Sequence, residues 1–212
     1  METPEKAASS APPAQPLGSS RRPPQRTSHA SACGPSAPLE RLRSRDGKDL
    51  ILRELQPDDV AAMQRGFAHL NAEEVRFRFL HPMTELPHES AVRLCNLDPQ
   101  TAPALVLVDP PGTAEPEIHA IARAYIDPAT LCAEFAIVVQ GRHAGQGFGR
   151  LLLTRLIELC RSRGVAELWG DVLMSNSPML GLCERLGFRR QSQAHEPGVL
   201  RVTLDLNPAA AG

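Results

Sequence analysis

The chain has 212 residues, of which 42% are apolar and 22% charged, and its formal net charge is −1. This charge balance gives no electrostatic reason to expect binding to nucleic acid or to a membrane surface, and no apolar run is long enough to span a bilayer. The five cysteines are odd in number and have neither disulfide nor zinc spacing, so we expect reduced thiols, no metal site and a cytoplasmic location.

Composition divides the chain into a tail and one domain. Residues 1–46 are rich in Pro, Ala and Ser and carry too little apolar surface to build a core, so we predict a disordered tail. Residues 47–207 are predicted to form one folded domain, which is long enough for a sizeable core. Residues 208–212 are predicted to be a flexible C-terminus.

The apolar periodicity within the domain predicts a mixed α/β fold with about seven strands and four to five helices. Strands are expected at 49–55, 104–109, 117–125, 132–139, 166–173, 188–195 and 199–206. Helices are expected at 57–70, 72–79, 87–96, 149–163 and 178–186. Hairpin turns are expected at Gly112 and at 196–198, and Ser177 is expected to cap the last helix.

A glycine-rich loop joins the strand at 132–139 to the helix at 149–163. Gly145, Gly147 and Gly149 can adopt positive φ angles and lack Cβ atoms, so consecutive backbone N–H groups can converge on an anion. The helix that follows adds the positive end of its dipole. The loop therefore predicts a site for a phosphate or pyrophosphate group.

The loop has three alternative interpretations. A nucleotide-binding P-loop needs Gly-Lys-Ser/Thr at its end, but Arg150 and Leu151 follow Gly149. A dinucleotide-binding fingerprint needs a third glycine where Leu152 stands, and the loop follows several strands instead of opening a βαβ unit. A turn that merely starts a helix stays an alternative for the loop taken alone.

The segment after the loop completes a longer pattern. A helix ending at Gly164, a strand, the turn at Asn176, a short helix and then Gly187-Phe188 follow in this order. Together with the loop, this order resembles the acetyl-CoA-binding half of the GNAT acyltransferases. The upstream segments Leu70-Asn71-Ala72-Glu73-Glu74, Arg78-Phe79 and Ala133-Glu134-Phe135-Ala136 are similar to the catalytic domain of bacterial Pat-type protein lysine acetyltransferases.

The resemblance implies the GNAT fold over about 48–206 and acetyl-CoA as co-substrate. Backbone N–H groups near Val138 and Val139 would polarise the thioester carbonyl, the loop would hold the pyrophosphate, and Asn176 would bind the pantetheine unless it serves only as a helix cap. The cofactor-binding set implied is Ile137, Val138, Val139, Ala144, Gly145, Gln146, Gly147, Phe148, Gly149, Arg150 and Asn176.

Glu134 is the candidate general base. In an extended strand its side chain shares a face with Ala136 and Val138, and partial burial there would raise its pKa toward neutrality. Taken alone, the position favours a solvent-facing glutamate at a strand start; the resemblance implies instead that Glu134 takes the proton from the acceptor amine. Candidate substrate contacts are Arg78, Phe79, Arg123 and Tyr125.

Two positions depart from the family pattern. Ala144 stands where Gln or Arg is usual and offers no side-chain contact to phosphate, although Arg142, His143, Gln146 or Arg150 could compensate. Cys183 stands where many members carry a Tyr that protonates the leaving thiolate, and a Cys in an apolar helix is most often core.

These features predict an N-acetyltransferase that transfers an acetyl group from acetyl-CoA to a primary amine, with a protein lysine as acceptor. The alternatives are a small amine such as a polyamine or amino sugar as acceptor, and a non-catalytic acyl-CoA-binding module. The sequence carries no signal for acyl-chain preference or oligomeric state.

Overall fold

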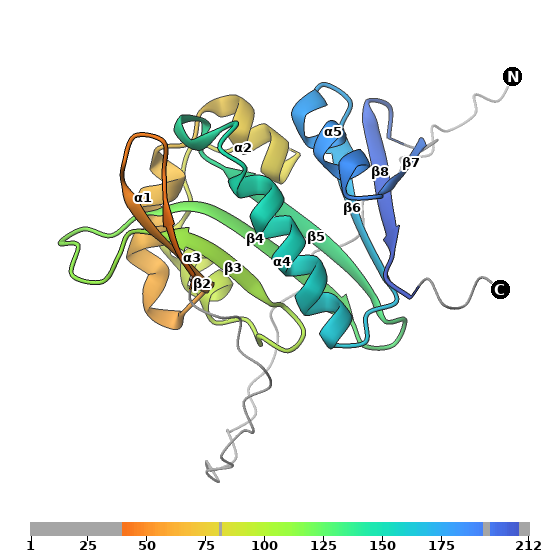
Figure 1. Cartoon of the computed structure of the whole chain (residues 1–212), viewed down its shortest axis with the longest axis horizontal. Helices are drawn as coiled ribbons and strands as arrows, with labels where there is room; N and C mark the ends of the chain where they lie inside the picture. The colour runs from red at the N-terminus through yellow and green to blue at the C-terminus, as the bar shows by residue number, and fades with distance from the viewer. Residues whose placement is uncertain (1–39, 81, 193–195, 208–212) are drawn as a thin grey trace, which may run out of the picture. The chain divides into compact units, whose positions relative to one another are not determined.

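The computed structural model describes residues 40–80, 82–192 and 196–207. Over these residues an eight-stranded sheet has the order β1-β2-β3-β4-β5-β6-β8-β7 (Figure 1). The strands are β1 (Glu40–Arg43), β2 (Asp49–Glu54), β3 (Ala104–Val108), β4 (Ile118–Asp127), β5 (Cys132–Val139), β6 (Glu167–Leu173), β7 (Arg189–Ser192) and β8 (Val199–Asp205). All neighbours pair antiparallel except β5 and β6, which are parallel. The mixed α/β fold is thus as predicted, with one strand more than expected.

The additional strand is β1, and it shows that the predicted tail boundary at residue 46 is wrong. β1 pairs with β2 from Glu40↔Leu52 to Arg43↔Asp49, and the Glu40 carboxylate accepts a hydrogen bond from Arg155 Nε at 2.6 Å. The strand has the sequence Glu-Arg-Leu-Arg, whose single apolar side chain gives almost no periodic signal. The rest of the predicted tail, residues 1–39, and the predicted flexible end, 208–212, lie outside the described residues.

The helices lie close to their predicted positions. They are a 3₁₀ turn at Pro57–Asp59, α1 (Val60–Ala68), α2 (Ala72–Phe79), α3 (His88–Cys95), a 3₁₀ turn at Gly141–His143, α4 (Phe148–Ser162) and α5 (Ser177–Arg185). Gly112 and Gly198 have positive φ in their hairpins, as expected from the turn signals. The cap of α5 was predicted wrongly: Asn176, not Ser177, is the N-cap, because the Asn176 side chain accepts a hydrogen bond from Met179 N–H at 3.2 Å.

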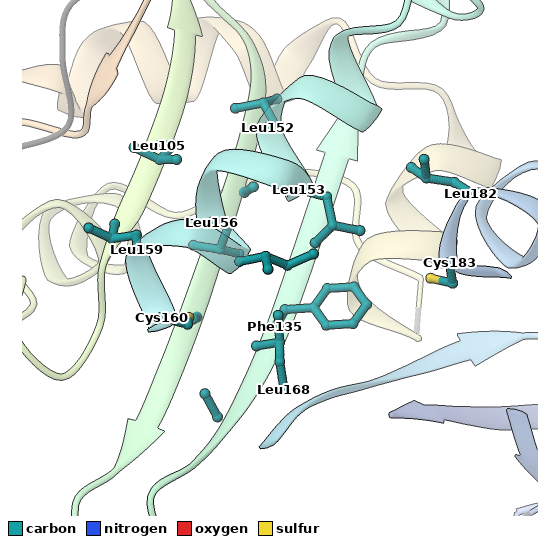
Figure 2. Packing of buried hydrophobic residues seen from close by; sticks show 14 of the residues in the cluster. Leu105, Phe135, Leu152, Leu153, Leu156, Leu159, Cys160, Leu168, Leu182 and Cys183 are labelled. Carbon is teal, nitrogen blue, oxygen red and sulfur yellow. The ribbon is translucent and has the colours of Figure 1, made fainter. Parts of the chain in front are cut away.

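The sheet has a hydrophobic core on each face. On one face, buried leucines of α4 pack on β3–β5, with Leu168 of β6 and Leu182 of α5 in the same cluster (Figure 2). On the other face, α1, α2 and α3 cover a second cluster that includes Met63, Phe67 and Val106. The packing of α4 on the sheet therefore fixes the helix that begins at the end of the glycine-rich loop.

The middle of the sheet contains a gap. β5 and β6 pair only from Cys132–Glu134 to Glu167–Trp169, and from Phe135 and Gly170 onward no pairing joins them. Gly170 leaves room for the Phe135 ring, since a Cβ at Gly170 would lie 2.8 Å from the ring. The strands part on the side where β5 leads into the glycine-rich loop.

Candidate functional site

The glycine-rich loop presents a run of free amides. Gly145 and Gly147 have φ angles of +68° and +88°, and Gly147 is the N-cap of α4 without a side-chain cap. Leu151 N–H, which donates to the Gly147 carbonyl at 3.0 Å, is the first amide of the helix with a backbone acceptor. In the described residues the N–H groups from 145 to 150 have no acceptor, which is the arrangement that binds a phosphate.

These amides open into a cavity of about 390 Å³. Every predicted cofactor-binding residue lines this cavity except Gln146, whose side chain instead contacts Arg45 and the Arg142 carbonyl. No Cβ-sized obstruction lies over Gly145 or Gly147, so a ligand can approach the backbone there. The cavity combines an anion-binding end with an apolar wall and suits an extended, phosphate-bearing ligand. Sequence reasoning missed the contribution of α5, which adds Met179, Leu182 and Arg185 to the wall.

The parting of β5 and β6 leaves two further amides unpaired. Gln140 N–H donates to the His119 carbonyl at 3.0 Å, so even-numbered residues of β5 direct their backbone groups toward β4. Odd-numbered residues direct theirs toward β6, and at Ile137 and Val139 β6 no longer pairs. The N–H groups facing the gap are therefore those of Ile137 and Val139. The assignment of Val138 N–H to carbonyl polarisation is corrected, because that group belongs to the β4 ladder.

Asn176 lies at the start of α5, next to the gap between β5 and β6, and also serves as the N-cap of that helix. Its Oδ1 caps α5, and it also lines the 390 Å³ cavity. No partner of its Nδ2 group is described, so this donor remains for a ligand.

Of the four residues that could compensate for Ala144, two have side-chain partners elsewhere and a third is buried with a neutral ring. Arg142 Nη2 points to Glu117 Oε1 at 2.6 Å and lies 2.9 Å from His119 Nδ1, and Gln146 is engaged as above. His143 is buried, and neither of its ring nitrogens has a partner. Burial, followed by the neighbouring His119 and Arg142, lowers the pKa of His143 and keeps its imidazole neutral. Arg150 alone is free to extend a cation along the cavity wall.

Glu134 lies in a second, smaller cavity of about 80 Å³. The two cavities share Phe77, Ile137, Asn176 and Met179, so they adjoin at the parted strands. Although the Glu134 side chain reaches solvent, desolvation raises its pKa, and the nearby Asp171 carboxylate raises it further. The direction of this shift is the one that was expected for a base.

Asp171 is a site residue that sequence reasoning missed. It lines the same cavity as Glu134 and binds Arg201 through two hydrogen bonds of 3.0 and 2.8 Å. The Arg201 guanidinium also lies 4.0 Å from the centre of the Trp169 ring. Because Glu134 pairs with Trp169 in parallel register, these strands bring Glu134, Trp169 and Asp171 to one face. Only the parallel register, which the sequence does not reveal, places the two carboxylates together.

The predicted substrate contacts separate into two groups. Arg78 lines the Glu134 cavity. Burial lowers the pKa of Arg78, and its interactions with the Tyr125 hydroxyl and with Glu134 partly oppose this shift. Tyr125 is directly opposite Glu134 in the β4–β5 ladder. Phe79 packs against Phe67 with ring centres 5.9 Å apart. Arg123 is 2% exposed and donates to the Leu94 carbonyl at 2.7 Å, at the end of α3. Arg78 therefore lies in the site and Tyr125 beside Glu134. Phe79 and Arg123 lie outside the Glu134 cavity, contact α1 and α3, and line a separate cavity of which Arg78 is also a wall.

Cys183 lies in the core. It is fully buried against the α4 face, and burial raises its pKa to about 12. The four cysteines within the described residues are all free thiols. In the same part of the chain, no cluster of His, Cys, Asp or Glu could hold a metal ion, and no helix is long and apolar enough to cross a membrane.

Comparison with known proteins is consistent with this geometry. The acetyltransferase (GNAT) family model matches residues 69–188. The [ribosomal protein bS18]-alanine N-acetyltransferase of Escherichia coli K12 is 45% identical over 69 residues, which are 32% of this chain and 45% of that protein. The chain thus spans about half the length of the curated relatives of this kind that it matches.

Solved structures with this fold include the GNAT domain of S. lividans PAT, with a TM-score of 0.68 and 24% identity over 79% of this chain and 96% of that one. A spermidine N-acetyltransferase from Vibrio cholerae, solved with CoA and spermine, has a TM-score of 0.58 and 19% identity over 74% of this chain and 96% of that one. At these identities the likeness concerns the fold.

Proposed function

Because the chain belongs to the acetyltransferase (GNAT) family, we propose that it is an N-acetyltransferase that uses acetyl-CoA to acylate a protein lysine in the cytoplasm. The observation that carries this proposal is the junction of two cavities, one lined by free loop amides and the other holding Glu134. Acyl transfer from a phosphate-bearing donor to an amine needs a site for the phosphate groups and, next to it, a base for the amine. The two adjoining cavities offer an anion-binding site and a carboxylate with a raised pKa.

The residues of the larger cavity bind and orient the donor. The amides from 145 to 150 and the Arg150 side chain hold its pyrophosphate, and Asn176 Nδ2 donates to its pantetheine arm. The N–H groups of Ile137 and Val139, which lack strand partners, polarise the thioester carbonyl. The donor supplies an acyl group on a thiolate leaving group whose conjugate thiol has a pKa near that of cysteine, about 8.5.

Glu134 prepares the acceptor. A lysine ammonium has an unperturbed pKa of about 10.4 and must lose a proton before its nitrogen can attack. The Glu134 carboxylate accepts that proton directly or through one water, a C–N bond then forms, and the C–S bond breaks. Because Cys183 is buried in the core, no described side chain at that position protonates the thiolate, and solvent can do so.

The lining of the smaller cavity is compatible with lysine. It combines apolar side chains of Phe77, Leu80 and Met179 with the Glu134 carboxylate; its other charged groups are Arg78 and Asp171, and Asp171 is paired with Arg201. A lysine side chain has the matching composition, since a slender apolar stem ends in one cation.

A second acceptor class is an N-terminal α-amine. It is favoured by the 45% identity of part of this chain to proteins named as alanine N-acetyltransferases. An α-amine has a pKa of about 7.7–8.0, so it depends less on a base at neutral pH than lysine does.

The test uses acetyl-CoA and three acceptors, read as free-thiol release and product mass. The acceptors are an N-terminally blocked peptide with one lysine, a lysine-free peptide beginning with alanine, and spermidine. We expect the blocked lysine peptide to give the highest kcat/KM; preference for the alanine peptide would assign the second class instead. Acetyl-CoA binding without acylation of any acceptor would contradict an enzymatic function.

The role of Glu134 is tested by Glu134→Gln, with Glu167→Gln as the matched control because Glu167 lines neither cavity. The Glu134 variant should retain CoA binding and lose about 10²–10⁴-fold in rate on the lysine peptide at pH 7. The deficit should shrink as the pH rises toward the pKa of the amine. A parental pH–rate profile for Glu134→Gln would show that this residue is not the base.

A further inference from the structure

The β1–β2 hairpin contacts the glycine-rich loop. Its turn, residues 44–48, is closed by Gly47 N–H, which donates to the Ser44 carbonyl at 2.9 Å. Within this turn, Arg45 N–H donates to Gln146 Oε1 at 2.8 Å and Arg45 Nη2 donates to the Gly145 carbonyl at 2.7 Å. Arg45, about a hundred positions earlier in the sequence, thus contacts two residues of the loop, one through its side chain and one through its backbone.

The contact at the Gly145 carbonyl determines where an amide points. The peptide unit between Gly145 and Gln146 is planar and trans, so its C=O and N–H groups point in opposite directions. With the carbonyl held by Arg45, Gln146 N–H is directed away from the hairpin. A charge-assisted bond to the carbonyl also polarises the peptide and strengthens its N–H as a donor.

A second chain of contacts joins the same hairpin to the start of the loop. Lys48 Nζ lies 2.8 Å from Asp109 Oδ1, and the same carboxylate lies 3.0 Å from His119 Nε2. The other ring nitrogen of His119 lies 2.9 Å from Arg142 Nη2. Arg45 therefore fixes the loop at Gly145 and Gln146, while Lys48 is linked to it at Arg142.

The loop carries a further sign of a ligand site. His143 lines the cavity, is 2% exposed, and has no hydrogen-bond partner at either ring nitrogen. A buried polar group without a partner is uncommon in a loop that serves only as a connection. Ala144 beside it supplies no polar side chain, so the loop depends on its backbone and on whatever orients that backbone.

We propose that Arg45 is a positioning residue for the acyl-CoA pyrophosphate, acting from outside the loop through the Gly145 carbonyl to orient the anion-binding amides. This inference rests on the proposed function and deepens it. It makes the hairpin, which precedes the segment matched by the family model at 69–188, a part of the donor site. Arg45 takes over the support of the loop that a longer side chain at position 144 would give.

The experiment measures CoA binding by calorimetry for the parent, Arg45→Ala, Arg45→Lys and the matched control Arg43→Ala. Arg43 lies in the same hairpin and carries the same charge, but its Nε donates a hydrogen bond to the Gly47 carbonyl within the hairpin and not to the loop. Arg45→Ala should raise the Kd for CoA by about three- to tenfold, as expected for the loss of one charge-assisted hydrogen bond at the surface. Arg43→Ala should stay within about twofold of the parent, and Arg45→Lys, which keeps the charge without the planar donors, should lie between.

Two conditions separate positioning from simple charge attraction. The ratio of the Kd for CoA of Arg45→Ala to that of the parent should persist at high salt, where interactions between exposed charges are screened. With S-acetylpantetheine, a thioester that lacks the pyrophosphate, Arg45→Ala and the parent should have the same kcat/KM. The role of Arg45 would be overturned by any of three results: equal Kd values for Arg45→Ala and Arg43→Ala, a Kd ratio that disappears at high salt, or an equal loss of kcat/KM with S-acetylpantetheine. A parent chain that does not bind CoA would overturn the proposed function itself.

Discussion

At the scale of single residues, the charges around Glu134 determine the pH at which it can work as a base. Desolvation and Asp171 raise its pKa, whereas Arg78 and Arg201 lower it. A carboxylate must be ionised to accept a proton, so the acidic limb of the pH–rate profile reports this balance.

Asp171→Asn tests the balance. Removing the negative charge lowers the pKa of Glu134, and Arg201, freed from Asp171, acts in the same direction. The acidic limb of kcat/KM on the lysine peptide should therefore move to lower pH. Asp205→Asn, at the far end of β8 and outside both cavities, should leave the profile unchanged. An acidic limb that stays in place in Asp171→Asn would mean that another group titrates there.

Gly147→Val tests the loop. At φ +88° a β-branched residue is strained, and its side chain would project where nothing of the protein lies, into the approach to the amides. We expect the Kd for CoA to rise at least about tenfold, which is roughly 1.4 kcal/mol. The control is Gly112→Val, because Gly112 has φ +92° and equally open surroundings in a distant hairpin. Gly112→Val should show a similar fall in Tm without the loss of affinity; equal Kd values for the two variants would contradict the loop assignment.

Residue roles were predictable where a side chain acts alone and unpredictable where it acts through a partner. The prediction for Gly147 rests on backbone freedom, and the prediction for Glu134 rests on strand alternation together with the family resemblance. Asp171 does not, because it joins Glu134 only through the parallel β5–β6 register. Arg45 does not either, since a contact across a hundred residues leaves no local pattern.

At the scale of secondary structure, β1 is the element whose contribution can be measured most directly. A chain beginning at residue 47 lacks the β1–β2 pairing, the partly buried Leu42 and the Glu40–Arg155 ion pair, all of which a chain beginning at residue 38 keeps. We expect the shorter chain to lose about 1–2 kcal/mol of unfolding free energy, which corresponds to roughly 2–8 °C in Tm for a domain of this size, and to bind CoA more weakly because Arg45 is absent. Calorimetric melting of the two chains tests this difference in stability, and identical Tm values would show that β1 adds none.

The position of α1 on the sheet depends on one close approach. A Cβ at Gly66 would lie 2.2 Å from the Ile118 carbonyl oxygen, and this neighbour is backbone that cannot rotate away. Gly66→Ala should therefore cost about 1–3 kcal/mol, as overpacking does. Gly181→Ala in α5 meets only the end of the Arg185 side chain and should stabilise the protein by up to about 1 kcal/mol through helix propensity. Urea unfolding of both variants tests the contrast, and a Gly66→Ala variant as stable as the parent would contradict it.

Elements with a periodic apolar stripe were predicted to within a few residues, as for α4 and β5. β1 was missed because its four residues hold one apolar side chain, and its stability comes from pairing and from an ion pair with α4. The cap of α5 was displaced by one residue because Asn176 and Ser177 both satisfy the local rule, and only the hydrogen bond to Met179 N–H distinguishes them.

At the scale of the whole molecule, the local signals of the strands and helices were sufficient to predict the mixed α/β class, whereas the GNAT fold was predicted from the resemblance of their order to a family. The arrangement of the site across β4, β5, β6 and α5 was predictable only through resemblance to a family. Strand order and the point at which β5 and β6 part depend on contacts that no single segment encodes.

The parting of β5 from β6 also bears on how the molecule holds together. The meander β1–β5 and the group β6–β8 are two leaves whose hydrogen-bonded seam is confined to Cys132–Glu134 and Glu167–Trp169. The smaller cavity borders both groups of strands, since Ile137 of β5 and Asp171 and Val172 of β6 line it, so a ligand there would contact both. A ligand that binds only the folded chain stabilises it by RT ln(1 + [L]/Kd), so we expect the free energy of unfolding to rise with the concentration of acetyl-CoA.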